Sequence, residues 1–404
     1  MKTISIVGGF YNELCFHPRF EDKNGSGFRA CRAIRSVNRS VSIEFHTYTS
    51  NEQELSICAR TFDIDVVPYP SNQDISFSYD HPLRTPSIIP RPDLIISPAP
   101  IEMKADNILC YGMLEGNAKV SGHKVVYDPQ SPVKPISFRD TGSTADQLAV
   151  VVNLKEAHKI AGSEDEKEIE TFFFEKERVD ILIIKMGPKG AKVYTKNGAP
   201  QIVPVYKTPS VWPIGSGDVF AAIFAYQWMI VDLPADKAAD IASFSTAMYC
   251  NSKNYDSMVI ERPKNITPLK ITDFPKGMVY LAGPFFNYAQ KWLINEAYHG
   301  LMGLGMRVFS PLHDVGEGTV EDGIAEKDIK GLEKCRIVFA VLDGLDSGTI
   351  FEIGYAIKMG IPVIVYVENE SPGQLLMAEG TGCLIERDFT TAMYKCLWLL
   401  AENE

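Results

Sequence analysis

Three observations predict that this chain folds as two α/β domains with parallel sheets. Short runs rich in β-branched residues alternate with amphipathic segments through most of the 404 residues, a pattern typical of strands covered by helices. The alternation stops at a polar stretch that contains Pro263, Pro268 and Pro275, and then resumes. The length also favours two or three domains, since one domain usually takes about 100–200 residues.

The expected strands follow the β-branched runs in chain order. Before the prolines they lie at residues 4–8, 42–49, 93–97, 124–128, 149–153 and 180–186, and after them at 278–283, 307–310, 336–342 and 362–367. The polar stretch has the composition of a connection, so we place a first domain at 1–265, a linker at 266–276 and a second domain at 277–404. Residues 69–91, the least regular segment, are expected to cover a substrate.

The composition excludes several classes of protein. With 40 basic and 51 acidic residues the net charge is −11, the opposite sign from that expected for binding to nucleic-acid backbones or anionic membranes. The most apolar stretch, residues 219–231, is shorter than the roughly 20 residues of a membrane span. The N-terminus leads into a strand and not into a signal segment, so we expect a cytoplasmic protein. The eight cysteines are scattered, which argues against disulfides and zinc.

The first candidate site is a glycine loop in front of a helix. Gly215, Ser216, Gly217 and Asp218 stand directly before an apolar run that predicts a helix. Glycines let the backbone approach a ligand closely, and the N-terminus of a helix attracts anions. Asp218 is placed to accept the proton of an attacking hydroxyl during phosphoryl transfer, and the same position would also suit a plain N-cap.

The surrounding motifs resemble the ribokinase-like, or PfkB, family of sugar and nucleoside kinases. They lie at residues 125–130, 153–158, 183–191 and 214–218. The resemblance implies a three-layer ribokinase-like sandwich, ATP and Mg²⁺ as cofactors, and Asp218 as the base. It assigns Gly187, Asn153 and Glu156 to ATP and phosphate together with the glycine loop, and gives Glu156 an indirect role in holding Mg²⁺. Asn153 and Glu156 also have the spacing of a capping box, and both interpretations can hold.

The chain departs from the family pattern at several positions. Trp212 and Pro213 stand where the family has residues that help to bind a monovalent cation, so potassium activation is not expected. The paired glycines of the family are represented only by Gly25 and Gly27, close to the first strand, so part of the lid is expected to be missing. Glu13 takes the approximate place of a substrate-holding aspartate. These departures leave open whether the domain transfers phosphate or is an inactive scaffold.

The second candidate site is a group of acids at the end of a strand. Asp343, Asp346 and Glu352 lie close together where a buried apolar run ends and a helix is expected to begin. Ligands of open α/β sheets collect at such strand ends, and like charges repel each other unless they serve a ligand. The local alternative is a capping box formed by Thr349 and Glu352.

This part of the chain resembles the nucleoside 2-deoxyribosyltransferase family. The matching motifs lie at residues 280–286, 310–314, 325–332 and 338–356. The resemblance implies a flavodoxin-like or Rossmann-like parallel sheet that needs no cofactor. It makes Glu352 the nucleophile, Tyr280 the residue that holds it, and Asp328 the proton donor or nucleobase contact. The sugar or base site is assigned to Asp346, Asp343, Gly283, Phe285 and Ser347.

The chemistry implied by this resemblance is coherent. Cleavage of an N-glycosidic bond passes through an oxocarbenium-like state, so a carboxylate can capture the sugar while an acid protonates the leaving base. Attack by a second base then gives exchange, and attack by water gives hydrolysis. Relatives that hydrolyse nucleoside 5′-monophosphates have a serine at the position of Asp346. A carboxylate there favours nucleosides, while the adjacent Ser347 keeps nucleotides open.

Some side chains near this site have two interpretations. Phe285, Phe286 and Tyr288 either stack on a base or belong to the core. His313 is expected to be a hydrogen-bonded structural residue.

Together these features predict an enzyme of nucleoside salvage. It cleaves and transfers the glycosidic bond of (deoxy)nucleosides and carries a fused ATP-dependent sugar or nucleoside kinase. Its expected partners are nucleosides, nucleobases and ATP, with neither nucleic acid nor membrane, and the family's shared sites imply a homo-oligomer. Two alternatives stay open: a nucleoside or nucleoside 5′-monophosphate hydrolase on an inactive kinase scaffold, and a non-catalytic nucleotide-sensing protein.

Overall fold

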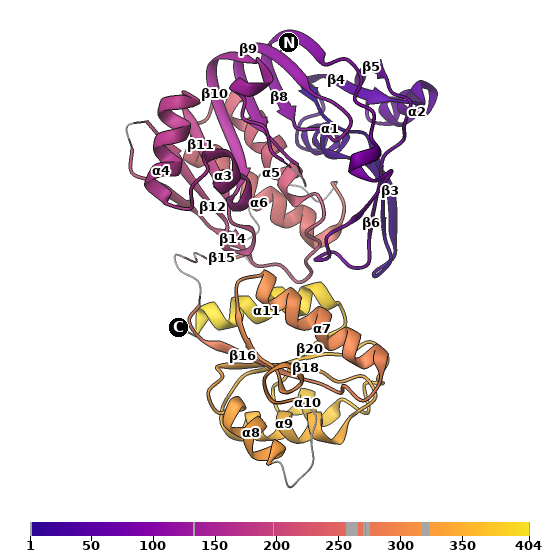
Figure 1. The fold of residues 1–404 in the computed structure, drawn as a ribbon, viewed down its shortest axis with the longest axis vertical. Coiled ribbons are helices and arrows are strands. Elements are labelled where there is room, and N and C mark those ends of the chain that lie inside the picture. The colour runs from indigo at the N-terminus through magenta and orange to yellow at the C-terminus, as the bar shows by residue number, and fades with distance from the viewer. Residues whose placement is uncertain are drawn as a thin grey trace. The chain divides into compact units, whose positions relative to one another are not determined.

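The computed structural model describes residues 2–131, 134–196, 198–255, 266–269, 271, 275–316 and 323–403, and the chain divides into two compact units (Figure 1). The larger unit comprises Met1–Thr208 and Trp212–Lys270, and the smaller comprises Pro209–Val211 and Ile271–Glu404. Pro263 lies outside the described residues, whereas Pro268 of the predicted linker belongs to strand β15 (Pro268–Leu269), which pairs with β14 (Val205–Tyr206). None of the helices in the described ranges is long and apolar enough to span a bilayer.

The larger unit is built around one mixed sheet. In the described part of the chain nine strands form it, in the order β13-β12-β11-β10-β9-β8-β1-β4-β5. The pairs from β11 to β5 are parallel, and β12 is antiparallel to both of its neighbours. The bounds are β1 Thr3–Val7, β4 Ser42–Thr49, β5 Asp65–Pro70, β8 Ile101–Tyr111, β9 Ala118–Asp128, β10 Thr144–Asn153, β11 Ile181–Lys185, β12 Ala191–Thr195 and β13 Gln201–Val203.

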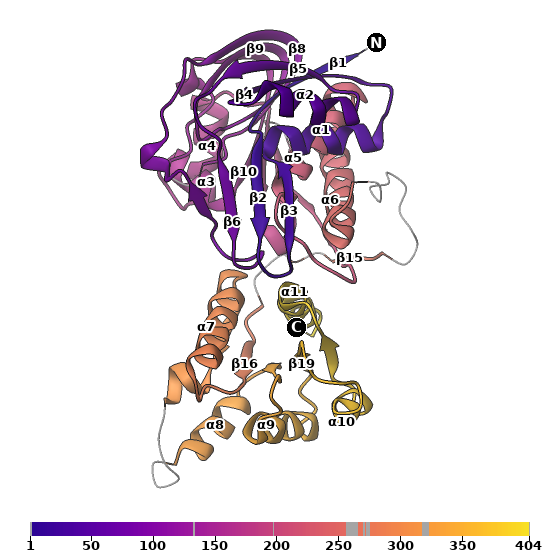
Figure 2. The same ribbon diagram turned by 90° about the vertical axis from the view of Figure 1, so that its right-hand side faces the viewer.

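Hydrophobic cores on the two faces of this sheet make it a three-layer sandwich (Figure 2). In β10, Ala149 and Val151 belong to one core and Val150 and Val152 to the other, because successive side chains of a strand point to opposite faces. The first face is covered by α1 (Ser26–Val37), α2 (Glu52–Thr61), α5 (Ser216–Ala225) and α6 (Ala235–Ser252), and the second by α3 (Leu154–Ala161) and α4 (Glu166–Thr171). The predicted fold class is confirmed for this unit.

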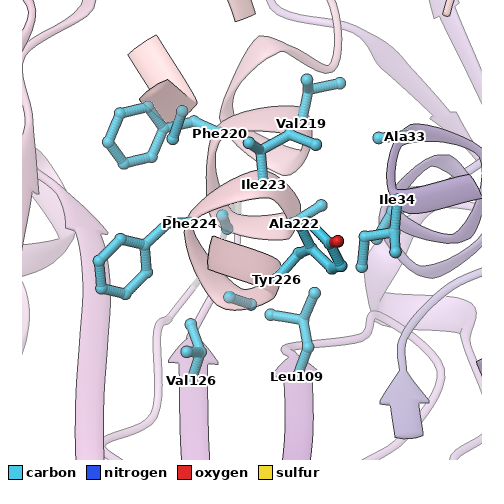
Figure 3. Close-up of a cluster of buried hydrophobic side chains, with 14 of the residues drawn as sticks. Ala33, Ile34, Leu109, Val126, Val219, Phe220, Ala222, Ile223, Phe224 and Tyr226 are labelled. Atoms are coloured by element: carbon cyan, nitrogen blue, oxygen red, sulfur yellow. The ribbon is translucent and has the colours of Figure 1, made fainter. Parts of the chain in front are cut away.

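Helix α5 is apolar on all sides because it is enclosed on all sides (Figure 3). Leu109 of β8 and Val126 of β9 lie on its sheet side, and Ala33 and Ile34 of α1 lie beside it. Phe224 is fully buried and stacks on Trp228, with 6.1 Å between the ring centroids. This packing fixes the direction of the helix, and with it the position of the glycine loop at its N-terminus.

A second, smaller sheet lies in the same unit. Its strands run in the order β3-β2-β6-β7, with β2 (Tyr11–Cys15) parallel to β6 (Ser76–Tyr79) and antiparallel to β3 (Phe20–Asn24). β7 (Ser87–Ile89) completes it. Strands β6 and β7 come from residues 69–91, so the least regular segment of the sequence contributes half of the strands named here.

The prediction of a strand at residues 93–97 is wrong. The first two of these residues belong to a short 3₁₀ turn (Pro92–Leu94), the others have no regular structure, and Leu94 and Ile96 are 56% and 69% exposed. Pro92 and Pro98 lack the N–H that a strand ladder needs, so their flanking positions disfavour pairing. The strand that carries the sheet here is β8, which begins at Ile101 and whose first half has the polar, exposed pattern of a strand with solvent on one face.

The smaller unit confirms the expected parallel α/β fold. Its described strands are all paired in parallel, in the order β17-β16-β18-β19-β20. The order reverses between β16 and β18, which is the place where open α/β sheets bind ligands. The bounds are β16 Met278–Ala282, α7 Tyr288–Gly303, β17 Arg307–Phe309, α8 Ile324–Leu332, β18 Ile337–Val341, α9 Ser347–Lys358, β19 Val363–Tyr366, α10 Leu376–Gly380, β20 Leu384–Glu386 and α11 Phe389–Glu402.

We predict that Phe224→Ala destabilises the larger unit by about 3–5 kcal/mol, because it removes a buried ring and leaves a cavity. Phe16→Ala is the matched control, since the Phe16 side chain is 57% exposed, and its cost should stay within about 0.5 kcal/mol. Urea unfolding curves of both variants measure the difference. Equal losses of stability would contradict the described packing of α5.

Candidate functional site

A cavity of about 400 Å³ in the larger unit collects the residues that the sequence assigned to phosphoryl transfer. It lies where β9, β10 and β11 reach their carboxyl ends and where α5 begins. All eight assigned residues line it: Glu13, Asn153, Glu156, Gly187, Gly215, Ser216, Gly217 and Asp218.

The glycine loop has a backbone conformation that requires glycine at its first position. Gly215 is the N-cap of α5 and is left-handed, with φ 75°, which favours glycine. A side chain on Gly215 would collide with the guanidinium of Arg29. The N–H of Ser216 donates to the carbonyl of Pro213 at 3.0 Å, whereas those of Gly217 and Asp218 have no preceding helical carbonyl to bond, so this end of α5 is suited to an anion.

Asp218 lies in the first turn of α5 but does not cap it. Its Oδ2 accepts a hydrogen bond from Nη1 of Arg29 at 2.7 Å, and its Oδ1 accepts one from Nε2 of Gln130. The hydroxyl of Tyr111 donates to the backbone carbonyl of Asp218 at 2.7 Å. The plain N-cap interpretation is therefore wrong, because Gly215 occupies that position and the Asp218 carboxylate turns to other partners.

Glu13 meets the same arginine from the small sheet. Nη2 of Arg29 pairs with Oε2 of Glu13, and the backbone N–H of Gly25 donates to Oε1 at 3.2 Å. Phe77 and Tyr79 of β6 line the cavity near this end. Residues 69–91 therefore contribute to the wall of the cavity, and the covering of a substrate by this segment stays a prediction.

Asn153 and Glu156 form a complete capping box at the start of α3. The Asn153 side chain accepts from the Glu156 N–H at 2.9 Å, and the Glu156 side chain accepts from the Asn153 N–H at 2.8 Å. Both residues also line the cavity. The capping box is confirmed, and the role in binding phosphate and Mg²⁺ stays a prediction that is compatible with the cap, since the Glu156 carboxylate still borders the cavity.

A buried ion pair lies beside the glycine loop. Nζ of Lys185 donates to Oδ2 of Asp128 at 2.5 Å, and the ammonium group lies 3.3 Å from where a Cβ of Gly217 would stand. Burial raises the pKa of Asp128 to about 7, and the positive charge of Lys185 offsets part of this rise. Oδ1 of Asp128 is buried without a hydrogen-bond partner. Lys185 therefore brings a positive charge to the wall of the cavity next to the loop, and Asp128 compensates that charge from beneath.

These residues fit a hydrated magnesium ion and not a metal bound directly by a protein cage. The described residues contain no group of three or more His, Cys, Asp and Glu side chains that could hold a metal. Mg²⁺ keeps several waters and commonly binds through one or two carboxylates and substrate phosphates. Glu156, which lines the cavity, suits such contacts through water.

In the smaller unit, a tyrosine and a glutamate meet where the strand order reverses. The hydroxyl of Tyr280 on β16 donates to Oε1 of Glu352 on α9 at 2.6 Å, and the Tyr280 side chain is fully buried. β16 and β18 are neighbours, and α9 follows β18, so the sheet topology brings these two residues together across 72 positions of sequence. This is the arrangement that the sequence analysis expected.

The carboxylates around this pair perturb one another. Burial raises the pKa of Glu352 to about 7, the hydrogen bond from Tyr280 lowers it, and the charges of Asp328 and Asp346 raise it. Burial also raises the pKa of Asp328, whose Oδ1 is buried without a hydrogen-bond partner. The site therefore holds two acids whose pKa values are raised by burial, that of Glu352 to about 7.

The capping box of Thr349 and Glu352 is not formed. Helix α9 begins at Ser347, and its N-cap is Asp346, whose Oδ2 accepts from the N–H of Thr349 at 2.8 Å and from its hydroxyl at 2.9 Å. Glu352 therefore lies in the second helical turn, and its carboxylate does not cap the helix. The capping-box interpretation of Glu352 is therefore excluded. Asp346 caps the helix and also lies near Glu352.

The other residues assigned to this site have different local roles. Asp343 accepts backbone N–H groups from Glu368 and Asn369, so its carboxylate ties two loops together. Ser347 is exposed at the start of α9. A side chain on Gly283 would clash with Ile294, so this glycine allows α7 to pack closely.

The aromatic residues after β16 are not core residues. Phe285 is half-buried and stacks on Phe286, which is 75% exposed, and Tyr288 is 86% exposed. His313 has the structural role expected of it, because its ring nitrogens contact Ser310 and Asn295 at 2.9 and 2.8 Å.

Sequence reasoning missed the cations of the larger unit's cavity and their partners. Arg29 and Gln130 bond assigned residues, Lys185 lies beside the glycine loop, and Asp128 pairs with Lys185. A signal was present for two of them. Arg29 comes two positions after the Gly25–Gly27 segment, and Lys185 ends a buried strand just before Gly187, both unusual places for a cation without a ligand or partner.

Two protein families match separate parts of the chain. Residues 118–258 match the pfkB family of carbohydrate kinases, and residues 279–388 match the nucleoside 2-deoxyribosyltransferase family. No curated protein matches the chain.

Solved structures similar to the chain include three kinases. A fructokinase from Vibrio cholerae O395 is 17% identical, with 64% of this chain and 96% of that chain covered and a TM-score of 0.46. A ribokinase from Thermotoga maritima is 18% identical, with 64% and 96% covered and a TM-score of 0.48. A nucleoside kinase from Methanocaldococcus jannaschii is 14% identical, with 64% and 94% covered and a TM-score of 0.46.

We predict that Gly215→Ala destabilises the protein more than Gly162→Ala. Both glycines have a positive φ, 75° and 71°, so both substitutions carry a similar backbone strain. Only at Gly215 does the new methyl group collide with Arg29, whereas nothing lies within 4 Å of the position at Gly162. Thermal melting of the two variants measures the difference. An equal shift would show that Arg29 does not pack against the loop.

Proposed function

Because the chain joins a PfkB kinase domain to a nucleoside 2-deoxyribosyltransferase domain, we propose that it both cleaves nucleosides and phosphorylates a sugar or nucleoside. The smaller unit cleaves and transfers the N-glycosidic bond of (deoxy)nucleosides, and the larger unit transfers phosphate from ATP. The single observation that carries the first activity is the hydrogen bond between the buried Tyr280 hydroxyl and Glu352.

The proposed glycosyl transfer proceeds in two balanced steps. Glu352 attacks the anomeric carbon as the C–N bond breaks, and Asp328 gives its proton to the departing base, leaving an ester between the sugar and Glu352. A second base then attacks the same carbon, the ester bond breaks, and the proton of the incoming base returns to Asp328. Burial raises the pKa of Asp328, which favours the protonated form that a proton donor needs.

Tyr280 keeps the nucleophile oriented and ionised. The hydrogen bond from its hydroxyl favours the charged form of Glu352 and fixes one of the two carboxylate oxygens, so the other faces the sugar. Because the Tyr280 hydroxyl is neutral, it holds the carboxylate of Glu352 without cancelling the negative charge. A nucleophile needs that charge.

The nearby carboxylates favour a nucleoside over a nucleotide. Asp346 is close enough to raise the pKa of Glu352, and its negative charge would repel a 5′-phosphate in the same way. Exposed Ser347 beside it is the feature that favours the nucleotide as a second candidate substrate.

In the larger unit, Asp218 accepts the proton of the acceptor hydroxyl. ATP with Mg²⁺ would supply the phosphoryl group, held by the N–H groups around Gly215–Gly217, with Glu156 contacting the metal through water. Lys185 neutralises charge that develops on the phosphoryl oxygens, because its ammonium lies beside Gly217. Glu13 bonds another hydroxyl of the acceptor from the small sheet.

A second candidate is a glycoside hydrolase carried on an inactive kinase scaffold. Both oxygens of Asp218 already accept hydrogen bonds, and the buried Trp212 packs against Phe20 instead of lining a cation site. This candidate predicts release of free base and free sugar, with no transfer to an added second base and no use of ATP. A homo-oligomer stays a prediction for either candidate.

We predict that the two activities separate cleanly by mutation. Glu352→Gln should lower glycosidic cleavage on the order of 10³-fold or more and leave phosphotransfer unchanged, because it removes the nucleophile. Asp218→Asn should lower phosphotransfer by about 10²–10⁴-fold and leave cleavage unchanged, because it removes the base.

Chromatography of a nucleoside panel, with and without a second base and with and without MgATP, measures both activities. Each variant is the control for the other. Absence of ATP turnover by the wild-type protein with any nucleoside or pentose would reject the kinase proposal and leave the glycosidic one standing.

We predict that kcat/KM for cleavage rises with pH through about 7, because Glu352 attacks only when it is ionised and its pKa is raised to about 7. Tyr280→Phe removes a hydrogen bond that lowers this pKa, so the rise should move to higher pH. The control is Tyr355→Phe, since Tyr355 also donates to a glutamate, Glu333, at 2.6 Å, but on the protein surface. A Tyr280→Phe profile that coincides with that of the wild type would contradict the assigned role.

A further inference from the structure

Arg29 is a buried cation to which neither the sequence analysis nor the proposed function gives a role. It lies in α1 and is only 2% exposed. Burying a guanidinium is costly unless good hydrogen bonds to carboxylates compensate for the lost hydration. Its position on the wall of the cavity therefore needs an explanation.

The partners of Arg29 supply one. Its two terminal nitrogens bond two different carboxylates, Asp218 at 2.7 Å and Glu13. Those carboxylates are 189 and 16 positions away in sequence and come from α5 and β2. Because the guanidinium is planar and rigid, one arginine fixes the distance and the relative orientation of both carboxylates.

The surroundings hold this arrangement from each side. The free oxygen of Glu13 accepts from the Gly25 N–H, and the other oxygen of Asp218 accepts from Gln130. The backbone of Gly215 covers the guanidinium so closely that no Cβ fits there. Arg29 thus joins the acceptor side of the cavity, the base and the glycine loop.

We propose that Arg29 is a positioning residue that sets the base Asp218 against the acceptor carboxylate Glu13. The inference rests on the proposed phosphotransfer. Without the guanidinium, the two carboxylates would repel each other across the cavity and the acceptor hydroxyl would lose its alignment with the base. With the guanidinium present, Arg29, Glu13 and Asp218 together carry a net charge of −1. The acceptor that binds here is therefore an uncharged polyhydroxyl compound and not a sugar phosphate.

Chemical rescue of Arg29→Ala tests this role. We expect kcat for phosphotransfer to fall by about 10²-fold, as for a misplaced reacting group, with a higher KM for the acceptor and an unchanged KM for ATP. Millimolar guanidinium should restore at least part of kcat by filling the vacated space, and urea, which has a similar shape without charge, should not.

Arg32→Ala is the matched control. Arg32 lies one turn further along α1 and pairs with Asp22 at 2.6 Å, but it does not line the cavity. This variant should keep wild-type kcat, and guanidinium should not change it. Arg29→Lys should recover only part of the activity, because one ammonium cannot bond both carboxylates in fixed geometry.

Each outcome decides the question. If Arg29→Ala melts like the wild type and keeps its kcat, or if urea rescues as well as guanidinium, the proposal is overturned. If Arg29→Ala does not fold, Arg29→Lys decides by whether kcat and acceptor KM change together while ATP KM stays constant. A wild-type protein that phosphorylates no acceptor overturns the proposed kinase function itself, whereas an active wild type with an active Arg29→Ala overturns only the role of Arg29.

Discussion

Parallel strands end at the same edge of a sheet, and both candidate sites depend on this constraint. In the larger unit, Asp128, Asn153 and Lys185 end three adjacent strands, so residues far apart in sequence meet beside one glycine loop. In the smaller unit, the order of the strands reverses between β16 and β18, which leaves a crevice where Tyr280 reaches Glu352. The helices that follow the strands then present their N-terminal turns to the same edge.

In the larger unit, the charged groups at this edge are buried. Because burial of an unpaired charge is costly, each of these groups lies against a partner of opposite charge. Lys185 is paired with the fully buried Asp128, and Arg29 with Glu13 and Asp218. Removal of one member would leave the other buried and unpaired, which costs more than the pair itself contributes. The geometry of the larger cavity is therefore held by its ion pairs as much as by the hydrophobic packing beneath it.

The sequence predicted those parts of the fold and sites that depend on local patterns. The glycine loop, the capping box of Asn153 and Glu156, and most strands are set by neighbouring residues, and they were found. Arg29 was missed because one of its partners is 189 positions away. The capping box of Thr349 and Glu352, the local alternative, is not formed because the chain turns earlier: Leu345 is left-handed, with φ 51°, and Asp346 caps the helix.

The two acids proposed to act, Asp218 and Glu352, have partners of different charge, and the difference suits their different roles. Glu352 must form a bond to carbon, and a cation against it would hold its electrons back from the anomeric centre. Its partner is the neutral hydroxyl of Tyr280, and burial keeps its pKa near 7. Asp218 only accepts a proton in a loose phosphoryl transfer, where alignment contributes more than basicity. A guanidinium partner is compatible with that role, because it fixes the carboxylate in place and leaves lone pairs on both oxygens for the acceptor hydroxyl.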